Sequence, residues 1–400
     1  MVTMNILHVS SAFYPGFSHG GIIPAFHELC RSLADQGCEV KVLTTDASGS
    51  GTAMAVDCER EFAMGARYSI RYCRYLAGRS VAPDLLWLLP RYVQWADVVH
   101  LSSVYNFPTI PTLALCRLRG KPVVWSPHGA LQRWEGSRRV AAKAIWEGIC
   151  RVLAPASLTL HATSAEEAEA SRRRFPKAAV VTIPYCVPIP ERPSHVEGRG
   201  VLRLLYLGRL DPKKGIENLL GAYARLKESG KVSFSLTIAG GGDASYTEAI
   251  KARAGALSGA EGDHSIVRVV GELTGEAKER LFAEADVLVV PSHTENFGVV
   301  VAEALLREVP VIASMGTPWK SLVELGCGFW VENNPRNLAD AIERMSRLPL
   351  REMGRRGRAW AMREFDPNAI GESMHAYYRG LIQARQNVVN SLDLCGRKHS

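Results

Sequence analysis

The chain has 400 residues, of which 47% are hydrophobic and 22% are charged, and its formal net charge is +8 at pH 7. This composition is typical of a globular protein with room for two domains, and it excludes a disordered, collagen-like or coiled-coil protein. No apolar run approaches the ~20 residues that a membrane-spanning helix needs. The first ten residues lack a basic region, so we expect a strand there and not a signal peptide.

Nine cysteines are scattered along the chain without a C-x-x-C pair. This favours a reduced, cytoplasmic protein over a zinc site or a disulfide framework. The positive charge lies mainly in residues 1–199, which carry 22 Lys and Arg against 16 Asp and Glu. Such a half could face nucleic acid, an anionic membrane or phosphorylated small molecules, and charge alone does not choose among them.

Short β-branched runs alternate with longer amphipathic stretches, a pattern typical of parallel sheets covered by helices on both faces. In chain order, strands are predicted at residues 5–10, 39–45, 97–101, 122–126, 157–162, 180–183, 202–208, 233–239, 265–270, 286–290 and 309–314. The clearest helices lie at residues 22–36, 216–229 and 275–285.

Four prolines between residues 184 and 193 interrupt this alternation. Proline fixes φ and removes a backbone donor, so we interpret residues 184–200 as an interdomain linker. The sequence therefore predicts an α/β protein with two doubly wound, Rossmann-like domains, residues 1–190 and 200–365, facing a cleft. A helix predicted at residues 366–388 could pack locally or cross back to the first domain.

Glu295 and Glu303 flank the predicted start of a helix near Gly298. The first-turn amides of such a helix are unpaired donors that suit an anion. Because carboxylates repel phosphate, the two glutamates suit hydroxyl groups instead: Glu303 those of a ribose, and Glu295 those of a second sugar. The alternative is that Glu295 only complements the helix dipole and Glu303 lies on a solvated face.

A glycine-bounded basic loop follows the first strand of the second predicted domain and carries Arg209, Lys213 and Lys214. Arginine can bind phosphate oxygens through two parallel hydrogen bonds, and lysine supplies a point charge. Together they could neutralise a diphosphate leaving group as its charge develops. The alternative is a surface turn with solvated lysines.

In combination, these motifs resemble the retaining family 4 glycosyltransferases, which have the GT-B fold. The resemblance covers most of the chain and takes in Gly-Arg-Leu-x-x-x-Lys-Gly at 208–215, the glycines at 240–242, Glu295-x7-Glu303, Gly20-Gly21, Ser126-Pro-His128-Gly129 and His161-Ala-Thr-Ser164. The chain also resembles a bacterial subgroup linked to envelope polysaccharides.

The resemblance implies a role for each matching residue. Arg209 and Lys214 would bind the donor diphosphate, Glu303 the ribose and Glu295 the transferred sugar, while His128 would lie near the reacting sugar. Gly20 and Gly21 would let the backbone approach phosphates or acceptor. The donor site would be completed by Asn296, by the amides of Phe297, Gly298 and Val299, and by Gly271, Glu272 and Leu273 next to the base.

The resemblance also implies a reaction: transfer of a hexose, with retention, from a UDP- or GDP-linked sugar to a glycan or lipid-linked saccharide. No D-x-D motif is present, so neither a metal ion nor another cofactor is expected. The family is usually discussed as a front-face mechanism, so we expect no covalent sugar adduct on Glu295. A nucleotide-sugar epimerase or hydrolase of the same architecture is the alternative enzyme.

Two positions depart from the family pattern. Glu308 stands where a glycine often precedes Val-Pro-Val-Ile, and a non-glycine residue in a left-handed cap costs about 1 kcal/mol, so the helix end could be reshaped. Trp319 lies in a segment that differs from the commoner glycine pair and glutamate. It is a packing residue or, alternatively, a sugar-stacking platform.

Residues 62–79 repeat arginines and tyrosines at helical spacing. If this segment is helical, its cationic and aromatic stripes suit an anionic membrane surface or a lipid diphosphate. The alternative is a helix that packs its tyrosines on the sheet and leaves its arginines in solvent. No nucleic-acid partner is expected because no recognised nucleic-acid motif occurs. A dinucleotide oxidoreductase is disfavoured because residues 11–21 lack G-x-G-x-x-G.

Overall fold

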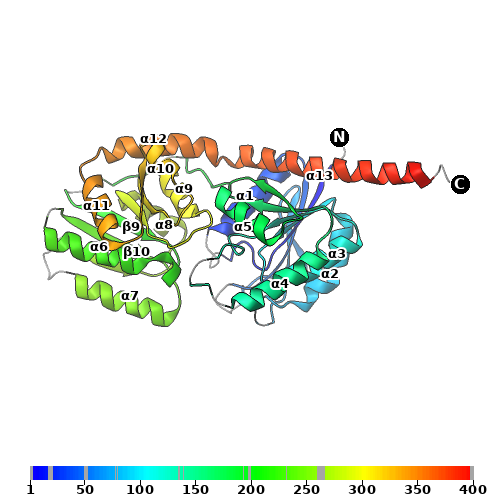
Figure 1. Ribbon diagram of the computed structural model, residues 1–400, viewed down its shortest axis with the longest axis horizontal. Helices are drawn as coiled ribbons and strands as arrows, with labels where there is room; N and C mark the ends of the chain where they lie inside the picture. The colour runs from blue at the N-terminus through cyan, green and yellow to red at the C-terminus, as the bar shows by residue number, and fades with distance from the viewer. Residues whose placement is uncertain are drawn as a thin grey trace. The chain divides into compact units, whose positions relative to one another are not determined.

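The computed structural model describes residues 3–16, 21–48, 53–76, 78, 80–133, 136–137, 139–191, 193–196, 200–230, 232–258 and 266–396, with side chains up to residue 387. The chain divides into two compact units (Figure 1). The first unit contains Met1–Cys186 and Pro367–Ser400, and the second contains Val187–Asp366. Each unit is an α/β structure built on one sheet.

The first unit holds an eight-stranded sheet in the order β3-β4-β2-β1-β5-β6-β7-β8, parallel except for β3. Its strands are β1 (Asn5–Val9), β2 (Glu39–Thr45), β3 (Glu61–Gly65), β4 (Tyr68–Cys73), β5 (Val98–Ser102), β6 (Val123–Ser126), β7 (Leu158–Ala162) and β8 (Ala179–Thr182). Its helices are α1 (Ile22–Asp35), α2 (Pro83–Trp95), α3 (Thr109–Leu118), α4 (Val140–Leu153), α5 (Ala165–Arg174) and α13 (Pro367–Gly396).

The second unit holds a six-stranded parallel sheet in the order β11-β10-β9-β12-β13-β14. Its strands are β9 (Leu202–Leu207), β10 (Phe234–Ala239), β11 (Val267–Val270), β12 (Val287–Val290), β13 (Val311–Ser314) and β14 (Gly328–Val331). Its helices are the short 3-10 helix η2 (Pro212–Lys214), α6 (Ile216–Ser229), α7 (Ala244–Leu257), α8 (Gly275–Glu284), α9 (Val299–Leu306), α10 (Ser321–Glu324), α11 (Pro335–Met345) and α12 (Leu350–Glu364).

Nearly continuous apolar strands explain why both sheets are covered on both faces. All residues of β5, β6 and β7 are buried, and so are those of β12 and β13. Strands with that pattern need helices on each side to exclude water. Each predicted strand is present within two residues of its expected start, whereas β3, β4 and β14 were not predicted.

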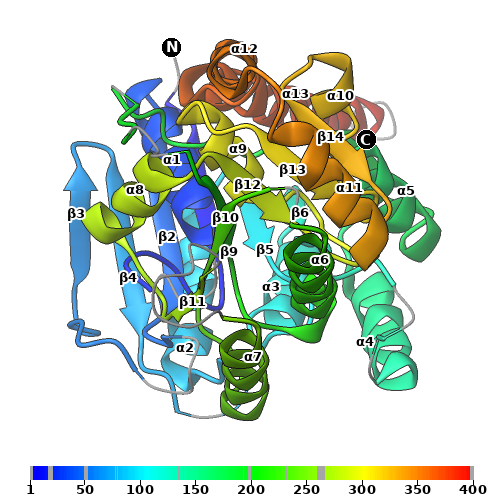
Figure 2. The same ribbon diagram turned by 90° about the vertical axis from the view of Figure 1, so that its left-hand side faces the viewer.

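The described residues between 62 and 79 form no helix, so the prediction of cationic and aromatic helix stripes is wrong. Residues 61–73 form the antiparallel pair β3 and β4 at one edge of the first sheet (Figure 2). Because side chains alternate along a strand, Tyr68 and Tyr72 are buried on one face while Arg71 lies on the other. The tyrosines therefore pack inward, but from a strand and not from the helix that the alternative interpretation also assumed. The helical stripes that suggested a membrane surface do not exist.

The proline-rich segment is irregular, as its composition indicates. Residues 183–191 and 193–196 form neither helix nor strand. The C-terminal helix α13 packs against α1 of the first unit. Its Tyr377 hydroxyl lies 3.0 Å from Thr159 Oγ1, and its buried Tyr378 hydroxyl contacts His100 Nδ1. None of the helices described is both long and apolar enough to cross a lipid bilayer.

Candidate functional site

In each sheet, the strand order reverses between two central strands. In the second unit, β9 lies between β10 and β12, so the strand order reverses there. Ligands of doubly wound sheets bind beyond the carboxyl ends of the strands at this reversal. The two loops that leave β9 and β12 are residues 208–215 and 291–298, which hold the basic loop and Glu295. The topology therefore brings the two strongest sequence motifs together at the carboxyl ends of β9 and β12.

The basic loop is held in shape by local contacts. Asp211 accepts a 2.9 Å hydrogen bond from the Lys213 amide and so caps η2, and the Tyr206 hydroxyl donates to the Arg209 carbonyl at 2.8 Å. Gly215 ends the loop with φ 62°, where a Cβ would stand 2.1 Å from the Pro291 carbonyl oxygen. Only glycine fits at this position, since both the backbone conformation and the close approach exclude a side chain.

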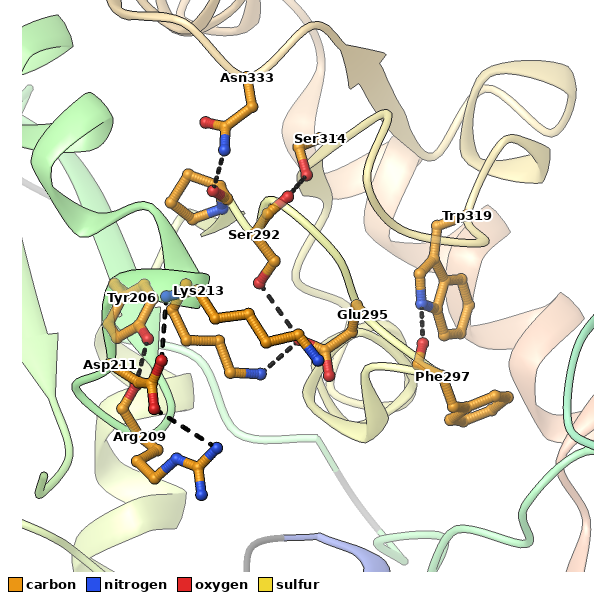
Figure 3. Close-up of polar contacts among 12 residues, drawn as sticks. Tyr206, Arg209, Asp211, Lys213, Ser292, Glu295, Phe297, Ser314, Trp319 and Asn333 are labelled. Carbon is orange, nitrogen blue, oxygen red and sulfur yellow. Dashed lines mark hydrogen bonds and ion pairs between the residues drawn. The ribbon is translucent and has the colours of Figure 1, made fainter. Parts of the chain in front are cut away.

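The loop after β12 is bonded to its surroundings on several sides. Its His293 amide donates to the Lys213 carbonyl at 2.9 Å, and its Glu295 amide donates to the Gly316 carbonyl at 2.8 Å. Asn333 Nδ2 donates to the Pro291 carbonyl at 2.6 Å (Figure 3). The two loops thus form one connected backbone frame, and the side chains they carry are positioned by it.

Lys214 and Glu295 form an ion pair in which Lys214 Nζ donates to Glu295 Oε2. The same oxygen accepts a 3.2 Å hydrogen bond from the Ser292 hydroxyl. Burial by itself would raise the pKa of Glu295, but the charge and hydrogen bond of Lys214, with help from Lys213 and Ser292, hold that pKa below its usual value. Glu295 is therefore a carboxylate at neutral pH.

Lys213 and Arg209 supply positive charge beyond this pair. Burial, together with the nearby charges of Lys214 and Arg209, lowers the pKa of Lys213, although Glu295 and Asp211 act in the opposite direction. The Arg209 side chain is 64% exposed and lies 3.7 Å from Asp211 (Figure 3). Arg209, Lys213 and Lys214 thus gather beyond the carboxyl end of β9, and the guanidinium group of Arg209 is exposed.

Glu303 lies on α9 and has a partner that the sequence did not indicate. Its side chain is almost buried, and its Oε1 accepts a 2.6 Å hydrogen bond from Lys278 Nζ of α8. The alternative interpretation of Glu303 as a solvated residue is therefore wrong. A buried carboxylate beside one ammonium group can still accept hydrogen bonds at its second oxygen.

The glycines at 240–242 serve packing between loops. A Cβ on Gly240 would lie 1.9 Å from the Gly208 carbonyl oxygen, and one on Gly242 would lie 2.0 Å from the Leu210 carbonyl oxygen. These residues therefore let the loop after β10 lie directly against the basic loop. Gly271 and Glu272 of the adjoining loop are exposed, and Leu273 is half-buried.

Trp319 is a packing residue, so the sugar-platform interpretation is wrong. It is 2% exposed and lies among Phe297, Trp360 and Phe365, with ring centroids 5.4 to 6.0 Å apart. Its indole Nε1 donates to the Phe297 carbonyl (Figure 3). The Phe297 side chain is itself buried, as is Asn296, while Gly298 has φ 76° and precedes α9. Val299 is the first residue of that helix.

The first unit has a cavity at its own strand reversal, where β1 lies between β2 and β5. The cavity has a volume of about 110 Å³ and is lined by residues that follow β1, by α1, by the end of β5 and by His128. His128 has φ 56°, and its Nδ1 lies 2.6 Å from the Tyr185 hydroxyl. Its buried Nε2 has no hydrogen-bond partner among the described residues. A ligand hydroxyl in the cavity would satisfy that nitrogen.

His128 is half-buried and lies beside the buried histidines His8 and His161. Burial, with a smaller effect of neighbouring histidines, lowers the pKa of His128 well below its usual value. The adjoining Gly129 amide donates at 2.6 Å to buried Glu167, which also accepts from Thr163. Gly21 is the residue before α1, and Gly20 lies outside the described residues.

The sequence did not indicate Lys278, Ser292, Asn333 and Glu167 as parts of these sites. Lys278 and Asn333 belong to other elements, so no spacing rule connects them to the motifs. Ser292 lies three positions before Glu295 in the same loop, and this short separation was the one signal that the sequence offered. Among the residues that the structure describes, His, Cys, Asp and Glu side chains form no group of three or more that could hold a metal ion.

Two family models match the chain, one to each part. Residues 190–360 match the model described as glycosyl transferases group 1, and residues 20–186 match the glycosyl transferase 4-like domain. A D-inositol 3-phosphate glycosyltransferase of Pseudarthrobacter chlorophenolicus is 27% identical over 90% of each chain. An uncharacterized glycosyltransferase of Methanocaldococcus jannaschii is 33% identical, but the match spans 36% of this chain and 35% of that one.

Solved structures share the fold along almost the whole chain. A sucrose-phosphate synthase of Thermosynechococcus elongatus has a TM-score of 0.73 at 23% identity and covers 95% of this chain and 100% of its own. The Anabaena protein HepE, solved with UDP and glucose, has a TM-score of 0.70 at 17% identity and covers 94% and 100%. At such identities the likeness describes the fold.

Proposed function

Since this chain belongs to the family 4 glycosyltransferases of the GT-B fold, we propose that it transfers a hexose from a nucleotide diphosphate sugar to a glycan or lipid-linked saccharide with retention of configuration. The observation that carries this proposal is the meeting of Arg209, Lys213 and Lys214 with Glu295 at the strand reversal of the second unit. Cations at the strand reversal suit a diphosphate, and a charged carboxylate beside them suits sugar hydroxyls.

Each unit has its own part in this proposal. The second unit binds the donor: Arg209 and Lys213 contact the diphosphate with the amides at the start of α9, and Glu303 binds the ribose. Lys214, held by Glu295, keeps two further ammonium protons with which to contact phosphate oxygens. The first unit binds the acceptor at the cavity beside His128. A cytoplasmic location and a role in envelope polysaccharide synthesis belong to the same proposal.

The donor half of the proposal rests on the diphosphate, so thermal stabilisation by UDP, GDP and ADP tests it. A ligand that binds the folded state raises the midpoint by mass action, and the preferred base should stand out. The variant R209Q should lose most of the shift, whereas R280Q, which alters an exposed arginine of α8, should keep it. Equal shifts in both variants would contradict the site.

The transfer itself is tested by donor consumption with and without saccharide acceptors. An acceptor-dependent rate supports transfer, whereas rapid turnover without acceptor would support an epimerase or hydrolase, which the comparisons do not favour. We propose further that no metal ion takes part, so that the rate persists in EDTA. Loss of the rate in EDTA and its return with manganese would contradict this.

Glu295 is paired with Lys214 and Ser292, and a carboxylate so engaged is a weak nucleophile. This supports retention without a covalent enzyme intermediate. Intact-protein mass spectrometry during turnover should show no added hexose. A hexosyl adduct located on Glu295 would overturn this part of the proposal.

A further inference from the structure

Helix α4 (Val140–Leu153) carries apolar side chains on its outer face. Its buried residues are Glu147 and Cys150, so the inner face is the one with the charge. On the outer face, Ile145 is 67% exposed, Ile149 42% and Val152 70%. At 100° per residue, these three positions fall within about 60° of one another, so they form one stripe.

The stripe is continuous and carries no charge. Ala141, Ala142 and Gly148 lie on the same side of α4, and the first two are exposed. Leu118, at the end of neighbouring helix α3, is 81% exposed. Arg117 joins the two helices because its Nη1 donates to the Val152 and Ala154 carbonyls at 2.9 and 3.0 Å. We call Leu118, Ala141, Ala142, Ile145, Ile149 and Val152 the α4 patch.

The apolar face of a helix is normally covered by a partner. Within the described part of the first unit, α4 packs against α3 on its inner side (Figure 1). The outer face has the exposures given above, and grouped apolar residues of this kind mark an interaction site. The α4 patch therefore indicates a partner that accepts aliphatic side chains.

Positive charges border the α4 patch. Arg119, Arg139 and Arg151 are all exposed, Arg119 beside Leu118 and the other two at and near the ends of α4. The only acidic residue of α4 is Glu147, which is buried and paired with Arg133 and Arg174. The exposed charge on this helix is thus of one sign.

The apolar stripe and the arginines that border it together indicate the kind of partner. A second copy of the chain, meeting the patch by two-fold symmetry, would set these arginines against the same arginines, and like charges repel. An anionic lipid bilayer instead offers an apolar interior for the stripe and phosphate groups for the cations. We propose that the α4 patch docks on the surface of an anionic bilayer, with α4 lying parallel to it.

Docking through α4 is independent of the donor chemistry proposed above. It assigns membrane contact to residues 118 and 139–152 and not to residues 62–79, whose helical stripes do not exist. The two surfaces are therefore separable by mutation. Arg74 directly follows β4 and is exposed, so it serves as the test of the other surface.

Flotation with vesicles of phosphatidylcholine alone, and with 30 mol% phosphatidylglycerol added, tests the proposal on the full chain. The protein should float with the anionic vesicles at low salt and far less at 0.5 M NaCl, since screening weakens surface electrostatics. I145S/V152S should lower the partition coefficient at least tenfold. R119Q/R139Q should lower it severalfold on anionic vesicles.

The matched control is V323S/L348S, which changes two exposed apolar residues of the second unit. It and R74Q should float like the parent chain. The thermal midpoint of each variant verifies folding, because the substituted side chains are exposed.

Three results would overturn the proposal. One is the absence of flotation with any vesicle, and another is unchanged flotation of I145S/V152S. The third is a dimer in sedimentation velocity that I145S/V152S dissociates, because the patch would then bind a second copy.

Discussion

Lys214 and Glu295 are 81 positions apart in the chain and form an ion pair beyond the carboxyl ends of two central strands of the second sheet. They meet because the loops that carry them leave β9 and β12, which are neighbours only in the folded sheet. Both side chains are largely buried, so each charge depends on the other.

The first prediction concerns the stability that the pair protects. K214M leaves Glu295 as a buried charge without its main partner, which should lower the free energy of unfolding by roughly 3 kcal/mol. The double variant K214M/E295Q should lose less, because no isolated charge remains. Urea denaturation measures both. K251M, which breaks an exposed pair with Glu248, is the control and should cost under about 1 kcal/mol. A double variant less stable than K214M would contradict the argument.

A second prediction separates ribose from diphosphate at Glu303. E303Q keeps the shape of the side chain but weakens its hydrogen bonds to hydroxyl groups, so UDP or GDP should bind about tenfold more weakly. Binding of inorganic pyrophosphate should not weaken. Isothermal titration calorimetry with both ligands measures this difference. E279Q, in the exposed Glu279 pair with Arg307, is the matched control. Equal loss for nucleotide and pyrophosphate would remove the ribose assignment.

The third prediction concerns the left-handed conformation of Glu308 at the C-terminal end of α9 and its effect on stability. Glu308 has φ 60°, so the left-handed cap is kept although the residue is not glycine, and the helix end is not reshaped. The Val309 amide still donates to the Ala304 carbonyl at 2.9 Å, closing the cap. E308G should raise the free energy of unfolding by about 0.5–1 kcal/mol, because glycine adopts this conformation without strain. E308A retains the Cβ and should change stability little. A less stable E308G would show that the Glu308 side chain stabilises the fold.

The fourth prediction concerns acid. Burial lowers the pKa of His8 to about 3 and that of His161 to about 4. Below pH 6.5 the unfolded chain therefore binds more protons than the folded one, and the free energy of unfolding falls with pH. The loss is about 1.4 kcal/mol per pH unit for each such histidine until its folded pKa is reached.

Unfolding measured between pH 7.5 and 5 checks this sign and slope. H8Q should lessen the slope by one proton, since glutamine does not titrate. S102A removes the hydroxyl 3.1 Å from His8 Nε2 but leaves the imidazole, and its slope should match that of the parent chain. Stability that rises as pH falls from 6.5 would contradict the neutral state of these histidines.

The sequence alone determined the alternation of elements and the chemistry of the motifs. Buried parallel strands need apolar residues in almost every position, so β12 and β13 are recognisable from their composition. The basic loop and the two glutamates were recognisable as well, because their residue types and spacing are local. In these motifs, arginine, lysine and glutamate contribute mainly their charge, so the residue type itself indicates the chemistry of the site.

The tertiary structure decided which charges meet. Lys278 reaches Glu303 from a separate helix, and Asn333 reaches Pro291 from beyond β14. No local pattern encodes such contacts, since they depend on how strands are ordered in the sheet. The segment 62–79 shows the same limit. Its arginine spacing fits a helix, yet Tyr68–Cys73 within it form a strand, because pairing with β2 satisfies backbone groups that a short isolated helix leaves open.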